Sequence, residues 1–252
     1  MTIGLSSKLG AGLRALRDLA EFPRLPRTTV HLMAERAQAN HPFYAWLVED
    51  FLADTAQPHP KLPFVRRLEY GVALCELPGS FAAYFGSLPG SARRNWRKAV
   101  RLGHAVRRFD YNSALDDVRE IWRSAPVRQG PLPPAVKEGV VVPSSDPPSL
   151  DPCHDFAYYG AFQEGRLRAY AACRIMGEFC DLCEIYGHAD YERDAVVPLL
   201  IIEVARELYL RHPAVRHYGY GTYFGASDSL RRFKRKFGFK PHHVRWLREG
   251  PC

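Results

Sequence analysis

The chain has 252 residues, of which 46% are hydrophobic and 12% aromatic, so it can bury a substantial core. This composition excludes disordered and collagen-like proteins, and no apolar run approaches the ~20 residues that a membrane-spanning helix needs. Lys and Arg number 35 against 27 Asp and Glu, a formal net charge of +8, and much of the excess lies in residues 93–108 and 231–240. Clustered cations favour RNA or an anionic membrane surface as partner, and a solubilising basic surface is the alternative.

The six cysteines do not form a motif for zinc or redox chemistry. Cys180 and Cys183 are spaced as C-x-x-C, but residues 179–186 around them read as a strand. We therefore expect buried free thiols and, without a signal-peptide pattern, a cytoplasmic protein. We expect no metal site, because the adjacent His242 and His243 would point to opposite faces of a strand.

Residues 1–62 are predicted to form a helical N-terminal extension of a main domain over residues 63–252. A helix is predicted near residues 5–20, where leucines alternate with cations, so it can dock on its own domain or touch a membrane peripherally. Pro23 and Pro26 break the pattern. A second helix is predicted over residues 29–53, divided by His41-Pro42, and residues 57–60 read as a linker.

A strand or hairpin is expected over residues 64–77, with Gly71 as a turn, and a short helix over residues 80–85. Residues 87–103 then predict a helix that begins at a serine and ends at a glycine, followed by a strand over residues 104–109. Its cationic face suits phosphate groups, whereas Trp96 is expected in the core. The candidate phosphate ligands on it are Arg93, Arg94, Arg97, Lys98 and Arg101.

Residues 110–124 read as a strand end and a helix, and residues 126–153 as a long Pro- and Gly-rich loop. A loop of that length is typically a lid, a substrate loop or a disordered segment. Within it, Arg128 and Gln129 are candidates to bind an anionic or peptide-like substrate, and an ordinary solvent loop is the alternative.

The second half is more regular. We predict strands over residues 157–162, 165–176 and 179–187, a helix over 190–210, a strand over 217–220, a helix over 227–237 and a strand over 242–247. That order resembles a GNAT acyltransferase core, and the resemblance extends over about residues 64–248. Phe233-Lys234-x-x-Phe237-Gly238 and the cationic helix with Asn95 and Gly103 resemble the FemAB branch, which uses aminoacyl-tRNA.

The resemblance implies an α/β (α+β) fold with a mixed, mostly antiparallel central sheet flanked by helices, and with an N-terminal helical extension. An enzyme of this superfamily that uses acetyl-CoA needs a glycine-containing loop that holds the pyrophosphate at a helix N-terminus. Here the matching stretch begins at Arg193, and Val196 and Pro198 replace the glycine and a small residue, so one N–H donor is lost. We therefore expect aminoacyl-tRNA as co-substrate without a cofactor, and acetyl-CoA or another acyl-CoA as the alternative.

The resemblance places Lys234 where it would stabilise the negative charge on the ester carbonyl. A base on the strand of residues 179–187 would deprotonate the acceptor amine, and Glu184 is the first choice, ahead of His188 and Tyr223. Ordinary structural roles are the alternatives: an ion pair for Glu184, a turn cap for His188 and packing for Tyr223. Further candidates are Tyr186 and Phe233 for substrate and Arg193, Arg231, Arg232, Arg235 and Lys236 for the donor's phosphates.

The leading hypothesis is transfer of an aminoacyl group from charged tRNA to an amine of a small-molecule or peptide-like acceptor, forming an amide. An acyl-CoA-dependent N-acyltransferase with a degenerate pyrophosphate loop is the first alternative. A non-catalytic RNA- or membrane-binding module with the same fold is the second.

Overall fold

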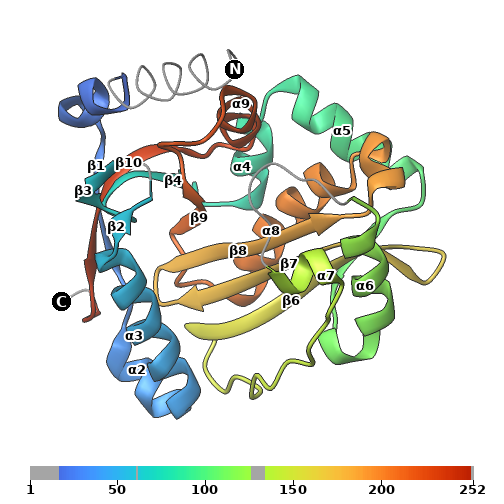
Figure 1. Ribbon diagram of the computed structural model, residues 1–252, viewed down its shortest axis with the longest axis horizontal. Helices are drawn as coiled ribbons and strands as arrows, with labels where there is room; N and C mark the ends of the chain where they lie inside the picture. Colours follow the sequence, from blue (N-terminus) through green and yellow to red (C-terminus); the bar gives the residue numbers. More distant parts are fainter. Residues whose placement is uncertain (1–16, 61, 126–133, 251–252) are drawn as a thin grey trace, which may run out of the picture.

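The computed structural model describes residues 17–60, 62–125 and 134–250. Its centre is an eight-stranded sheet in the order β1-β10-β4-β9-β8-β7-β6-β5 (Figure 1). Five of the seven neighbouring pairs are antiparallel, and β1–β10 and β8–β9 are parallel, which confirms the predicted mixed sheet. Its strands are β1 (Arg27–His31), β4 (Tyr70–Glu76), β5 (Ala105–Arg108), β6 (His154–Gln163), β7 (Arg166–Met176), β8 (Phe179–Gly187), β9 (His217–Thr222) and β10 (Lys240–Leu247).

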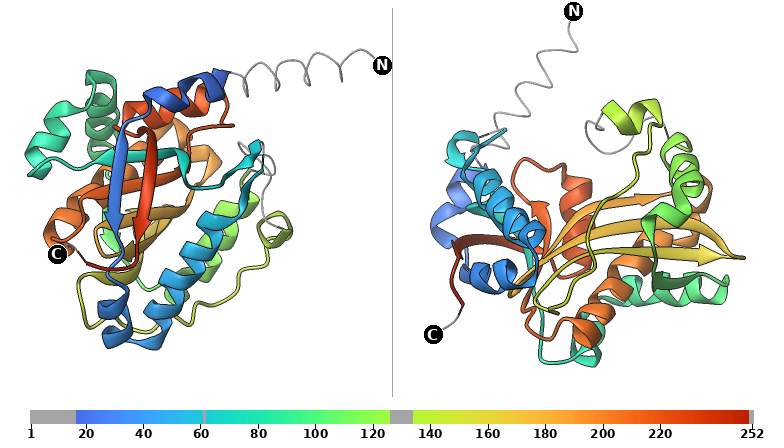
Figure 2. Two further views of the ribbon diagram at one scale, coloured as in Figure 1. Left: turned by 90° about the vertical axis from the view of Figure 1, so that its left-hand side faces the viewer. Right: turned by 90° about the horizontal axis from the view of Figure 1, so that it is seen from below.

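Helices cover both faces of this sheet, as Figures 1 and 2 show. Side chains alternate along β7, so Ala171 and Cys173 pack in the core under α8, while Tyr170 packs in the cluster beside α6. A third cluster fills the space under α3. The helices are η1 (Phe22–Arg24), α2 (Ala34–Asn40), α3 (Pro42–Ala56), α4 (Phe81–Ser87), α5 (Gly90–Arg101), η2 (Tyr111–Ala114), α6 (Leu115–Arg123), α7 (Pro134–Glu138), η3 (Ala189–Asp194), α8 (Val196–Arg211) and α9 (Asp228–Lys236).

The N-terminal region differs from the prediction in one strand. Residues 29–31 were predicted as helix but belong to β1, where Thr28, Thr29 and Val30 have the β-branched side chains that suit a sheet. β1 pairs with β10 at the edge of the main sheet, and α2 and α3 supply the helical extension, divided at His41 as predicted. The predicted helix of residues 5–20 lies mostly outside the described residues; residues 17–21 are helical.

The turn that was predicted at Gly71 lies at other residues in the structure. β3 (Leu62–Arg66) pairs with β2 (Pro58–His59) in a small separate sheet, so the residues read as a linker include a strand. The chain turns at residues 67–69, before β4, whereas Gly71 lies within β4. Its φ is +70°, and a Cβ there would lie 2.2 Å from the ring of Phe224, so only glycine fits.

The sheet opens between β8 and β9. Their parallel pairing runs only from Phe179↔His217 to Asp181↔Gly219, and beyond it β8 continues to Gly187 without β9 beside it. The β7–β8 register shifts by one residue at Cys183, which leaves this residue as a bulge. Cys183 is therefore exposed, contrary to the expectation of a buried thiol, whereas Cys180 is buried within the strand.

No helix in the described residues is long and apolar enough to cross a membrane.

Candidate active site

Glu184 lies on β8 just beyond the bulge, where the sheet has opened. Its carboxylate accepts a hydrogen bond from the Tyr170 hydroxyl at 3.3 Å. The Tyr170 hydroxyl in turn accepts one from Trp122 Nε1 at 2.8 Å. Because Tyr170 is fully buried and Trp122 nearly so, this chain of hydrogen bonds fixes one side of the carboxylate.

Burial raises the pKa of Glu184 above its usual 4.5, and the Tyr170 hydrogen bond opposes this rise. The side chain is nevertheless exposed, so solvent or a ligand reaches it from one side while protein surrounds it on the others. A carboxylate with a raised pKa is a better proton acceptor near neutral pH than an ordinary surface glutamate. Glu184 makes no ion pair with any described residue.

Tyr186 lies two residues further along β8 and shares a face with Glu184, as the predicted alternation requires. Their partners on β7 are Ala172 for Glu184 and Tyr170 for Tyr186. The ring of Tyr186 lies 5.6 Å from that of Tyr170 and 6.2 Å from that of Trp122. Tyr186 therefore lies beside the carboxylate.

Lys234 is on α9, on the β9 side of the opening, and it is almost completely buried. Its Nζ donates hydrogen bonds to the carbonyls of Tyr220 at 2.6 Å and Thr222 at 2.8 Å, and it lies 4.6 Å from the Tyr220 ring centroid. Both carbonyls belong to the part of β9 beyond its last pair with β8. Desolvation lowers the pKa of Lys234 to about 7, although the charge of Asp181 opposes this shift.

Glu184 thus lies on β8, whereas Lys234 lies on α9 and bonds to the part of β9 that separates from β8. Tyr186 lies on β8 and Tyr220 on β9, and burial, followed by the charge of Tyr186, raises the pKa of Tyr220.

The structure gives three other candidates packing or capping contacts. His188 caps η3, where its Nδ1 accepts from the N–H of Asp190 at 3.3 Å. Tyr223 is buried, and its hydroxyl accepts from Arg235 at 2.6 Å. Phe233 packs on Phe237 with their centroids 5.0 Å apart. None of these contacts brings the three to Glu184. The two loop candidates, Arg128 and Gln129, lie outside the described residues.

The cations of α5 form an exposed surface without acidic partners. All of them are exposed except the half-buried Arg93, and no carboxylate among the described residues forms an ion pair with them. Lys98 Nζ donates to the carbonyl of Arg193 at 2.6 Å, which joins this surface to η3. Lys236 of α9 is half-buried, and its pKa is lowered first by desolvation and then by the charge of Arg94. Trp96 instead packs on Phe85 and donates to Glu203 of α8, as expected.

Two of the α9 arginines have partners within the protein. Arg231 is buried and forms a bidentate ion pair with Asp18, with both N–O distances at 2.8 Å. This pair joins the N-terminal segment to α9, and it leaves Arg231 poorly placed for a phosphate outside. Arg232 and Arg235 are exposed, although Arg235 also bonds to Tyr223.

The N-terminus of α8 is where a CoA pyrophosphate would be expected. Val196 is buried, and Val197 packs so closely on β8 that a Cβ on Gly187 would lie 2.7 Å from it. Pro198 offers no N–H, and Asp194 just before the helix accepts a hydrogen bond from His104. The residues present therefore do not fit the pyrophosphate loop of a CoA enzyme.

The hydrogen-bonding partners of Glu184 were not found from the sequence. Tyr170 and Trp122 were assigned only to a strand and a helix, and their contact depends on β7–β8 register and on how α6 packs. The available signal was the presence of Tyr158, Tyr170 and Tyr186 on three successive predicted strands, since alternating positions of neighbouring strands can line one face of a sheet.

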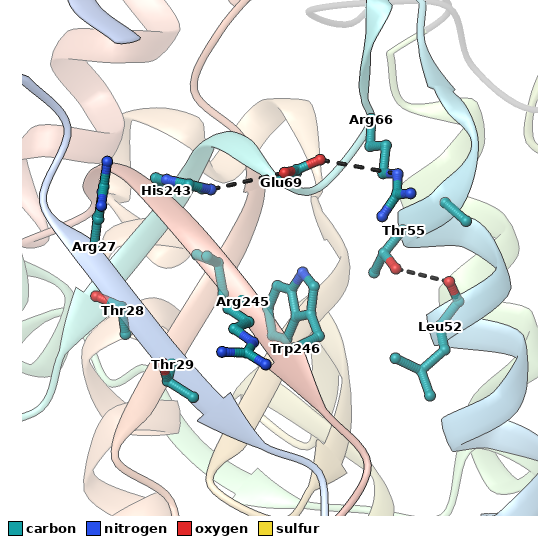
Figure 3. Close-up of a pocket in the computed structure, with 12 residues that line it drawn as sticks. Arg27, Thr28, Thr29, Leu52, Thr55, Arg66, Glu69, His243, Arg245 and Trp246 are labelled. Carbon is teal, nitrogen blue, oxygen red and sulfur yellow. Dashed lines mark hydrogen bonds and ion pairs between the residues drawn. The ribbon is translucent and has the colours of Figure 1, made fainter. Parts of the chain in front are cut away.

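A pocket of about 690 Å³ lies at the other end of the sheet, between β1, β10, α3 and the turn before β4 (Figure 3). Its carboxylate, Glu69, lies 3.7 Å from His243 and 4.0 Å from Arg66, and the Thr55 hydroxyl donates to the Leu52 carbonyl. None of the predicted catalytic residues lines it. At ordinary strand spacing β10 is about 14 Å from β8, so this pocket is separate from Glu184.

No protein-family model and no curated protein matches the chain. Among solved structures, FemX aligns with a TM-score of 0.53 at 10% identity, over 68% of this chain and 59% of that one. A tandem GNAT protein from the clavulanic acid biosynthesis pathway gives 0.45 at 13% identity, over 69% and 50%. L-PGS from Bacillus licheniformis gives 0.41 at 11% identity, over 69% and 59%. The chain spans less than two thirds of the length of each. The likeness to FemX shows that the two chains share a fold, in agreement with the predicted mixed sheet flanked by helices.

Proposed function

We propose that the protein is an acyltransferase that moves an aminoacyl group from aminoacyl-tRNA to an amine. The observation that carries the proposal is the contrast between two neighbouring surfaces. The α8 N-terminus does not fit one pyrophosphate, whereas α5 beside it presents a row of cations that have no acidic partner among the described residues. A donor with many phosphates fits that pair of surfaces better than CoA does.

The chemistry assigned to the opening between β8 and β9 needs two groups. Glu184 takes a proton from the acceptor ammonium, and the free amine attacks the ester carbonyl of the aminoacyl-tRNA. A C–N bond forms, the ester C–O bond breaks, and the terminal ribose hydroxyl of the tRNA leaves with a proton. The positive charge of Lys234, close to the opening, stabilises the negative charge that develops on the carbonyl oxygen.

Binding of charged tRNA and of acetyl-CoA, measured by titration calorimetry, tests the choice of donor. We expect charged tRNA to bind with a log–log salt slope of about −4, the value for about five phosphate contacts. The variant Arg94→Ala/Arg97→Ala/Arg101→Ala should weaken this binding and reduce the slope in magnitude. Arg216→Ala, an exposed arginine on the loop before β9, serves as the single-charge control.

Two results would overturn the proposal. One is micromolar binding of acetyl-CoA without binding of charged tRNA, which would favour the acyl-CoA-dependent alternative. The other is tRNA binding that never leads to an acid-stable amide when aminoacyl-tRNA is incubated with a panel of amines. That outcome would favour a non-catalytic RNA-binding module.

A further inference from the structure

The surroundings of Glu184 are aromatic on several sides. Tyr111 and Tyr158 stack with their ring centroids 4.6 Å apart, and the Tyr111 and Tyr170 centroids are 6.0 Å apart. The Tyr170 hydroxyl donates to Glu184 at 3.3 Å, so the stacked pair of Tyr111 and Tyr158 lies next to the residue that contacts the carboxylate. Tyr186 completes this tyrosine cluster on the β8 side.

Accessibility differs within the cluster. Tyr111 and Tyr170 are buried and form its back wall, whereas Tyr158 and Tyr186 are half-buried and Glu184 is exposed. A small ligand can therefore reach the carboxylate and touch the outer rings without unfolding the buried ones.

The negative charge of Glu184 determines which kind of ligand the site would bind. The described residues supply Glu184 with no cationic partner, whereas Asp155 on β6 and Asp181 on β8 form ion pairs with arginines. An anion would be repelled by the carboxylate, and a neutral ligand would gain a hydrogen bond and apolar contact but no attraction between charges. An organic cation would gain both the charge of Glu184 and the negative faces of the tyrosine rings.

We propose that Glu184 and the tyrosine cluster form a binding subsite for an organic ammonium group. For the proposed function this subsite holds the acceptor in its protonated form, and it favours amines on an aliphatic stem over α-amino acids, whose carboxylate would approach Glu184. The inference therefore rests on the proposed function for its biological role, but cation binding itself does not require a donor.

Tetramethylammonium tests the subsite separately from the reaction, because it carries a charge but has no N–H to be acylated. We expect the full-length protein to bind it in a titration followed by NMR or calorimetry, and to bind tert-butanol, of similar size but neutral, at least about fivefold more weakly. Glu184→Gln should weaken tetramethylammonium binding by a similar factor or more.

A pair of variants at Tyr186 separates ring recognition from general packing. Tyr186→Phe keeps the ring and should bind tetramethylammonium as the wild type does, whereas Tyr186→Leu should lose about fivefold. Circular dichroism melting checks that both variants are folded. Equal binding of tert-butanol and tetramethylammonium, or equal binding by the Leu and Phe variants, would overturn the inference. If the wild-type protein binds tetramethylammonium but does not bind charged tRNA, the result would count against the proposed function and not against the subsite.

Discussion

Replacement of Lys234 by methionine should change how stability depends on pH. Methionine fills a similar volume but removes the ammonium that donates to the carbonyls of Tyr220 and Thr222. Two opposing terms decide the outcome. The variant leaves two carbonyls without their donor, which costs about 1–3 kcal/mol each, and it also removes the cost of burying a charge.

The charge term follows from the pKa, which falls from the usual 10.5 to about 7 on folding. Since the unfolded chain binds the proton more tightly, the wild type is penalised most below pH 7 and regains stability as pH rises toward 10.5. At about 1.4 kcal/mol per pKa unit the penalty is roughly 4 kcal/mol at pH 7 and roughly 2 kcal/mol at pH 9. At pH 7 the two terms nearly cancel, and at pH 9 the carbonyl term dominates.

Urea denaturation of both proteins at pH 7 and pH 9 measures this difference. The wild type should gain about 2 kcal/mol over Lys234→Met between the two pH values, because only the wild type recovers the penalty. Using the difference between the proteins cancels the titration of all other groups. A difference that stays constant with pH would refute the reasoning, since Lys234 would then keep an ordinary pKa and remain charged in the fold.

Three further predictions concern the site and the fold. Glu184→Gln should lower amide formation by about 10²–10⁴-fold with tRNA binding unchanged, and it should remove the acidic limb of the rate profile, which lies above pH 4.5 because burial raises the pKa of Glu184. Gly71→Ala should lower the unfolding free energy by about 2 kcal/mol or more in urea titrations, whereas Gly79→Ala, where a Cβ meets nothing within 4 Å, should change it little. Asp18→Ala should cost about 3–5 kcal/mol in the same assay, because it leaves Arg231 buried and unpaired; a cost below 1 kcal/mol would mean that the N-terminal segment does not hold α9.

The second half of the fold could be predicted from the sequence because its signals are local. The strands β6, β7 and β8 and the helices α8 and α9 each have their own periodicity and turn residues, and their order matched a known core. β1 could not be predicted in this way. Its five residues precede two real helices, and its strand conformation depends on pairing with β10, more than 200 residues away in the chain.

The candidate site was predicted in part for a related reason. Alternation along one strand placed Glu184 and Tyr186 on the same face, which needs only local information. The hydrogen bonds to Glu184 depend on which β7 residue lies opposite it, and that register changes at the Cys183 bulge. Burial of Arg231 likewise depends on Asp18, a residue far away in sequence with no local pattern that marks it.

Glu184 is stronger evidence for a ligand-binding or catalytic function than Lys234 is. Where β8 leaves β9, the carbonyls of Tyr220 and Thr222 lose that neighbouring strand, and a buried donor from α9 meets them. This donation is a structural role that an enzyme and a binding module could share, so Lys234 by itself does not separate the two. Glu184 satisfies no such backbone requirement: it accepts one hydrogen bond, pairs with no described cation and keeps its raised pKa while exposed. Burial of a carboxylate without a cationic partner lowers the folding stability. Residues with such a perturbed pKa are found more often at sites that bind a ligand or catalyse a reaction.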